Sequence, residues 1–179
     1  MPSAVLERDK RKIMEPDKNK TIVIALGGNA ILSDGDAGDV AQQMLSMELA
    51  CRQLVPLFRS GNRVVITHGN GPQVGSLLIQ QEESASDIPP QPLDICVAMT
   101  QGQIGTMLQQ VLDKILRAES IQRDVVTLIS HFVVAEDDPD FSLGSKPIGP
   151  FLDAVSKEKY EERGHTVMEV QPGSDKPFR

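Results

Sequence analysis

The sequence lacks the long apolar runs and the paired cysteines that mark membrane and secreted proteins. No run approaches the roughly eighteen apolar residues of a membrane-spanning helix, and no secretory apolar segment is present. The two cysteines, Cys51 and Cys96, fall within apolar helical patterns and far from any CxxC spacing. We therefore expect two buried free thiols in a cytoplasmic protein that makes no membrane contact.

Basic charge is also scarce. The chain has 18 Lys and Arg against 25 Asp and Glu, which gives a formal net charge of −7. Nucleic-acid binding needs clustered Lys and Arg that contact phosphates, so we expect no nucleic-acid partner. A pocket for a small anion remains possible, because a few backbone amides and one lysine can bind such a ligand.

Several common catalytic motifs are missing. There is no Walker A loop, no GxSxG elbow and no Asp/Glu cluster that would cage a metal, so no metal site is expected. Residues 69–75 resemble a dinucleotide fingerprint, but the third glycine is displaced by one position and Pro72 intervenes. The three histidines are not at metal-ligand spacings. We interpret His131 and His165 as loop or strand-end residues, whereas His68 could equally be a hydrogen-bonded loop residue or a ligand.

What the sequence does contain is two apolar runs of strand length that each end in a loop rich in glycine and asparagine. Residues 21–26 precede Gly-Gly-Asn-Ala at 27–30, and residues 63–67 precede His-Gly-Asn-Gly at 68–71. Glycine has no Cβ, so its backbone amide can approach an anion closely, and a following helix adds unpaired N–H groups. In a parallel sheet both loops would face one crevice at the carboxyl ends of the strands.

The remaining patterns alternate between helix and strand, which predicts an α/β fold with a mostly parallel sheet. Unbroken apolar strands are typical of strands buried on both faces. We expect residues 1–19 to form a mobile leader and residues 136–150 to be irregular. The predicted helices span residues 40–59, 72–83, 94–118 and 153–163, and further strands are predicted at 125–129 and 166–170.

Four motifs in this order are similar to the amino-acid-kinase superfamily. They are GGNA at 27–30, HGNGPQVG at 68–75, AMTQG at 98–102 and KPIGPF at 146–151, and the last is similar to the carbamate kinase branch. The resemblance runs from about Lys20 to Arg179. It implies a three-layer αβα sandwich of which these residues form the N-terminal, carbamate-binding part, with a protruding subdomain at about 136–170. The C-terminal half, which in this family carries the nucleotide pocket, is then incomplete.

The resemblance also implies an activity and a set of site residues. The activity is reversible phosphoryl transfer between ATP and carbamate, giving carbamoyl phosphate and ADP, with Mg²⁺ arriving with the nucleotide. It further implies a homodimer that acts in arginine catabolism. By position, the first loop lines the transfer site, the second loop binds carbamate, and a lysine of the subdomain closes over both. Those residues are Gly27, Gly28 and Asn29, then Gly69, Asn70 and Gly71, and finally Lys146, with Lys146, Gly28 and Asn29 as the catalytic set.

Simpler readings remain open. The two loops could be tight turns that only allow entry into helices, and Lys146 could be a solvated loop lysine. The chain could also be a non-catalytic anion-binding or interaction protein, or a related kinase acting on another carboxylate. KPIGPF argues against the related kinase, because the protruding subdomain looks like a feature of the carbamate kinase branch.

Overall fold

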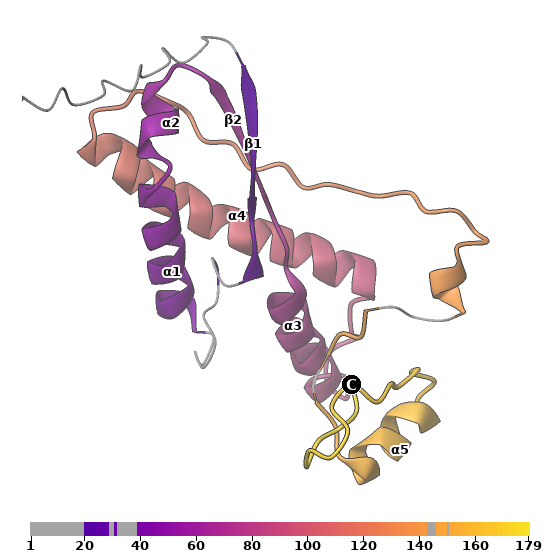
Figure 1. Ribbon diagram of the computed structural model, residues 1–179. Coiled ribbons are helices and arrows are strands. Elements are labelled where there is room, and N and C mark those ends of the chain that lie inside the picture. Colours follow the sequence, from indigo (N-terminus) through magenta and orange to yellow (C-terminus); the bar gives the residue numbers. More distant parts are fainter. Residues whose placement is uncertain (1–19, 29–30, 32–38, 143–145, 150) are drawn as a thin grey trace, which may run out of the picture.

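The fold was analysed in a computed structural model of the chain (Figure 1). The structure describes residues 20–28, 31, 39–142, 146–149 and 151–179. The predicted leader at 1–19 and Asn29 lie outside these residues.

Two parallel strands form the sheet. β1 (Thr21–Leu26) pairs with β2 (Arg63–His68) in a register that runs from Thr21 opposite Arg63 to Leu26 opposite His68. The connection between them contains α1 (Val40–Arg52) and α2 (Val55–Arg59). Parallel neighbours need such a crossover, because a short turn cannot return the chain to the same end of the sheet. The prediction of a parallel α/β sheet is confirmed.

Helices cover one face of this sheet. Ile24, Val64 and Ile66 pack against the hydrophobic core, whereas the side chains of Val23 and Val65 on the other face are 64% and 44% exposed. The expectation that the strands are buried on both faces is therefore wrong for the described part of the chain. A three-layer sandwich has helices on both faces, so the fold here is an incomplete αβα sandwich.

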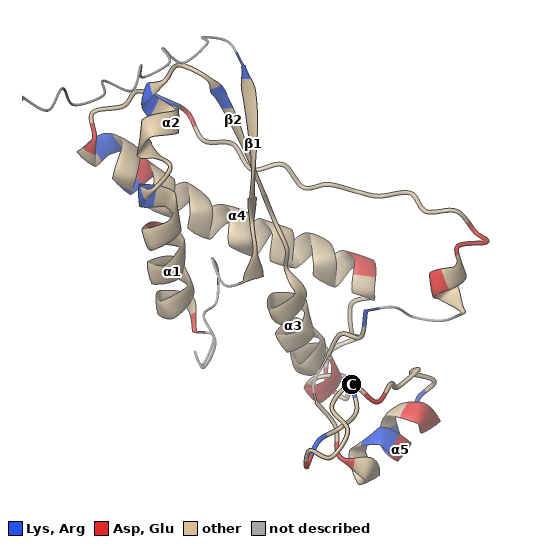
Figure 2. Cartoon of the chain, in the orientation of Figure 1, with Lys and Arg blue, Asp and Glu red and all other residues tan. Residues whose placement is uncertain are grey.

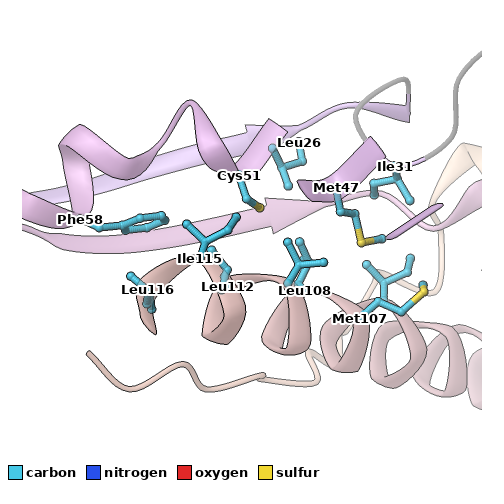
Figure 3. Close-up of a cluster of buried hydrophobic side chains, with 12 residues drawn as sticks. Leu26, Ile31, Met47, Cys51, Phe58, Met107, Leu108, Leu112, Ile115 and Leu116 are labelled. Carbon is cyan, nitrogen blue, oxygen red and sulfur yellow. The ribbon is translucent and has the colours of Figure 1, made fainter. Parts of the chain in front are cut away.

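The core lies between the strands, α1 and the long helix α4 (Leu93–Ala118), as Figure 3 shows. Met47 and Cys51 of α1 are fully buried against α4, and burial raises the pKa of the Cys51 thiol to about 11. Cys96 is also buried and free, so the prediction of two buried thiols is confirmed. The apolar stripe of α4 is buried along its whole length: Ile104, Leu108, Val111, Leu112, Ile115 and Leu116.

The helix predicted over residues 40–59 is interrupted before Pro56. Proline has no N–H, so the bond that would reach back to the carbonyl of Arg52 cannot form. The chain instead makes tight turns, in which the N–H of Leu54 donates to the carbonyl oxygen of Cys51 at 3.0 Å. Gly61, at φ +81°, adopts the left-handed conformation that stops the helix after this region.

The strand predicted at residues 125–129 is absent. Residues 121–135 run as an extended chain with no strand partner in the described structure. Side chains of α4 bind its backbone instead: Gln109 Nε2 donates to the oxygen of Val125, and Gln101 exchanges two hydrogen bonds with the backbone of Ser130. A β-branched apolar run favours the extended conformation, but a strand also needs a second backbone edge beside it.

The C-terminal part forms a small subdomain below α3 (Gly71–Glu83) in Figure 1. It contains α5 (Ala154–Glu162), whereas η2 (Pro139–Phe141) lies apart from it, in the connection that follows residue 135 (Figure 1). Asp153 caps α5 by accepting from the N–H of Ser156, as a short helix from 153 requires. In place of the strand predicted at 166–170 there are isolated bridges, including one between Glu169 and Phe178, because Pro177 cannot donate to a longer ladder.

Candidate anion-binding site

The strand register brings the two glycine loops to one edge of the sheet. Leu26 pairs with His68 at the carboxyl ends of β1 and β2, so Gly27 and Gly69 follow side by side in the pairing order. In the first loop the carbonyl oxygen of Gly28 accepts from the N–H of Ile31 at 3.0 Å. The loops therefore share an edge, as the sequence predicted.

The glycines of these loops are surrounded by open space. A Cβ added to Gly27, Gly28, Gly69 or Gly71 would meet no atom within 4 Å. None of these four glycines has a positive φ. The described glycines with a positive φ lie elsewhere, at Gly61, Gly149, Gly164 and Gly173. Neither packing nor backbone strain requires glycine at these four positions. Their smallness keeps the backbone amides accessible, which favours the ligand-binding interpretation over the tight-turn interpretation.

The second loop leads directly into the N-terminus of α3. Asn70 is the residue that precedes the helix, and its side chain makes no capping hydrogen bond to it. Pro72 in the first turn has no N–H to satisfy. Among the described residues, no side chain caps the first-turn amides of Gly71 and Gln73, which carry the positive end of the helix dipole.

Asn70 is bound to α4 instead. Its side-chain Nδ2 donates to the hydroxyl oxygen of Thr100 at 2.9 Å and to the carbonyl oxygen of Val97 at 3.4 Å. Thr100 is completely buried. Thr100 belongs to the AMTQG motif, but the sequence predicts no role for it, because a helical pattern does not show that this threonine meets the second loop.

A second buried polar contact joins the helices that follow the two loops. Gln73 Nε2 of α3 donates to Gln43 Oε1 of α1 at 2.8 Å, and both side chains are buried. Buried amides of this kind are stable only when paired. The contact holds the first turn of α3 against α1, and the sequence does not predict it, because its two residues lie 30 positions apart.

A cavity of about 600 Å³ opens beside the second loop. Asn70 and His68 line it, with α4 as its floor. Consecutive residues 64–68 of β2 form one wall and consecutive residues 123–128 form the other, so backbone edges face the cavity on both sides. Gly27 and Gly28 do not line it.

Lys146 lies apart from this cavity. It is exposed and lines a second cavity of about 990 Å³ between α3 and the C-terminal subdomain. The KPIGPF motif nevertheless touches the second-loop motif, because a Cβ on Gly75 of α3 would lie 3.5 Å from the backbone nitrogen of Gly149. The structure thus brings the two motifs into contact without placing Lys146 at the loops.

Charge is sparse where the loops meet. Figure 2 shows described basic residues at the amino ends of β1 and β2 and on α2, not at the carboxyl ends of the strands. An anion at this edge would therefore be bound by amides rather than by a described lysine or arginine. The part of the chain that the structure describes contains no cluster of three His, Cys, Asp or Glu residues suited to a metal. No described helix is long and apolar enough to cross a membrane.

Comparison with known proteins identifies relatives over most of the chain. The sequence profile of the Amino acid kinase family matches residues 20–154. The carbamate kinase of Thermococcus kodakarensis is 44% identical over 154 residues, which cover 84% of this chain and 49% of that protein. Carbamate kinase 2 of Staphylococcus aureus strain Mu50 is 50% identical over 154 residues, covering 86% of this chain and 46% of that protein.

Solved structures show the same relationship. A carbamate kinase from Giardia lamblia bound to AMP-PNP superposes with a TM-score of 0.78 at 34% identity, covering 90% of this chain and 51% of that one. A protein of Aeropyrum pernix K1 gives a TM-score of 0.81 at 37% identity, covering 89% and 51%. The chain thus spans about half the length of the relatives it matches.

Proposed function

The chain belongs to the amino acid kinase family, and from this premise we propose that it carries the carbamate-binding site of a carbamate kinase. The reaction is the reversible transfer of a phosphoryl group between MgATP and carbamate, giving carbamoyl phosphate and ADP. The similarity to carbamate kinases at 44% and 50% identity supports this substrate class. A cytoplasmic homodimer that acts in arginine catabolism is part of the same proposal.

One observation carries the proposal: two glycine loops with open backbone amides lie at the same carboxyl edge of a parallel sheet. In phosphoryl transfer the protein mainly positions two anionic reactants and neutralises charge on the migrating group. Backbone amides do this without reorganising during the reaction. Gly27, Gly28 and Asn29 would line the transfer site, and Gly69, Asn70 and Gly71 would bind the carbamate.

The first test is the binding of carbamoyl phosphate to this chain by isothermal titration calorimetry. We expect saturable binding that Asn70→Ala weakens by roughly tenfold, because one hydrogen-bonded group of the loop is lost. Gln103→Ala, which truncates an exposed amide of α4, is the matched control and should leave the affinity unchanged. Lower stability of Asn70→Ala with unaltered affinity would instead support the tight-turn interpretation.

Lys146 is proposed to supply a mobile positive charge from the subdomain. Lys146→Ala should lower the formation of ATP from carbamoyl phosphate and ADP by about tenfold or more wherever that activity is present, since one charge-assisted donor is lost. Binding of carbamoyl phosphate to the loops should remain, because Lys146 lies outside the Asn70 cavity.

The second candidate function is anion binding without catalysis, and the separation of Lys146 from the loops favours it. It predicts that the chain binds carbamoyl phosphate, that Lys146→Ala changes nothing, and that no ATP forms. Equal ATP formation by wild type and Lys146→Ala would remove Lys146 from the catalytic set.

A further inference from the structure

The side-chain amide of Asn70 can be oriented in only one way. The Thr100 hydroxyl donates its single hydrogen to a carbonyl of its own helix, with Val97 O at 2.9 Å and Cys96 O at 3.1 Å. Towards Asn70 the hydroxyl can therefore only accept. Val97 O, at 3.4 Å from the Asn70 amide, is an acceptor as well. Because both groups on α4 are acceptors, the –NH₂ end of the Asn70 amide must face them. These contacts decide between the two orientations of the amide, whose oxygen and nitrogen are otherwise hard to distinguish.

The other end of the amide is then left open. No described residue donates a hydrogen bond to Asn70 Oδ1. Among the described residues, Gln42 Oε1 is the one buried side-chain nitrogen or oxygen atom that lacks a hydrogen-bond partner. Asn70 Oδ1 also lacks a described partner but is not among these buried atoms, so it is accessible to solvent. Asn70 lines the cavity of about 600 Å³ at the end of β2. The loop thus presents an acceptor whose direction is fixed by a buried threonine.

We infer that Thr100 is a positioning residue: it fixes the Asn70 amide so that Oδ1 accepts a hydrogen bond from the amino group of the ligand. The inference rests on the proposed function and extends it to substrate selection. Carbamate and carbamoyl phosphate carry an –NH₂ donor, whereas acetate and acetyl phosphate have a methyl group of similar size in its place. The site would therefore select carboxyl-type substrates that carry an amino group.

This assignment leaves Asn70 only an acceptor to offer to the ligand. In the structure its donor end is bound by α4, so donation to oxygens falls to the backbone amides of the glycine loops. The backbone amides of the glycine loops would then bind the oxygens of the ligand, and Asn70 Oδ1 would bind its amino group.

The test compares carbamoyl phosphate with acetyl phosphate by calorimetry on the 179-residue chain. The wild type should prefer carbamoyl phosphate by roughly threefold to tenfold, the range of one neutral hydrogen bond. Thr100→Val, which keeps the shape and removes the hydroxyl, should lose this preference without changing the affinity for acetyl phosphate. Thr100→Ser should keep the preference. Thr106→Val makes the same chemical change at an exposed position of α4 and should behave as the wild type.

The outcomes separate the two levels of the argument. Equal affinity of the wild type for both compounds overturns the inference while leaving the anion site intact, and this measurement needs no variant to fold. Loss of both affinities in parallel in Thr100→Val identifies a merely structural role and also overturns it. Absence of binding by either compound contradicts the proposed function itself, and the inference falls with it.

Discussion

Tyr160 lies where the C-terminal subdomain contacts α3, and its pKa depends on that contact. Burial, followed by a hydrogen bond to Glu82 and the charge of that carboxylate, raises the pKa of Tyr160 to about 12 from 10.0. His165 lies on the same carboxylate, with Nε2 3.6 Å from Glu82 Oε1, and its ring is 5.5 Å from that of Tyr160. The chain has one tyrosine and no tryptophan, so its tyrosinate absorbance belongs to Tyr160 alone.

We predict that the tyrosinate absorbance rises with a midpoint near pH 12 in the folded protein. Because the folded-state pKa is raised, the stability linked to this group is complete below pH 10 and is lost as the pH rises towards 12. Glu82→Gln should lower the midpoint, since it removes the charge but not the burial. Glu83→Gln, whose charge has a smaller effect, is the control. A midpoint at 10 in the wild type would mean that the subdomain does not pack on α3.

At the residue scale, the sequence predicted the loop glycines and Asn70 but not their supports. Short motifs mark residues that are adjacent in the chain. The contacts of Asn70 with Thr100 and of Gln73 with Gln43 each join residues that are 30 positions apart. No periodicity shows which polar residue of an apolar stripe will meet another helix, so these supports became visible only in three dimensions.

Among the elements, α4 shows how two glycines of one helix can differ. A Cβ on Gly105 would overlap the Thr127 side chain, whose own Cβ would be 3.0 Å away. A Cβ on Gly102 would meet nothing within 4 Å. The helix is unbroken at both glycines, and close packing applies to Gly105 and not to Gly102.

We predict opposite effects of the two glycine-to-alanine substitutions on the free energy of unfolding. Gly102→Ala should raise it by up to about 1 kcal/mol, the helix propensity of alanine over glycine. Gly105→Ala should lower it by about 1–3 kcal/mol, the usual effect of overpacking. Urea denaturation of both variants beside the wild type measures the difference. Equal stabilisation would show that residues 121–135 do not rest on α4.

Helix boundaries could be predicted where a single residue, such as a glycine or a capping aspartate, sets the end of the helix. Gly61 and Gly164 follow helix ends at positive φ, and Asp153 caps the helix predicted over residues 153–163. Pro56 divides the helix predicted over residues 40–59 into α1 and α2. The prediction of a strand at 125–129 was wrong for another reason. An apolar, β-branched composition favours an extended backbone, but a strand also needs a neighbouring strand to pair with, and the composition of the segment does not show whether one is present.

On the scale of the whole molecule, the sheet is open. The second edge of β2 faces the cavity, and the extended run beyond it exposes apolar side chains, with Val126 75%, Leu128 80% and Val133 92% exposed. Exposed apolar segments with unpaired backbone groups are templates for pairing with another chain. The sequence predicted the apolar run but assigned it to a buried strand.

We predict that the purified 179-residue chain associates as its concentration rises, through the extended segment at 121–135. Val133→Lys places a charge on the most exposed of these side chains and should shift sedimentation towards the monomer without lowering the free energy of unfolding, since Val133 packs little in the monomer. Val155→Lys, at a valine of α5 that is 65% exposed, is the matched control and should leave association unchanged. If Val155→Lys and Val133→Lys reduce association equally, net charge governs it; if neither does, the extended segment is not the contact.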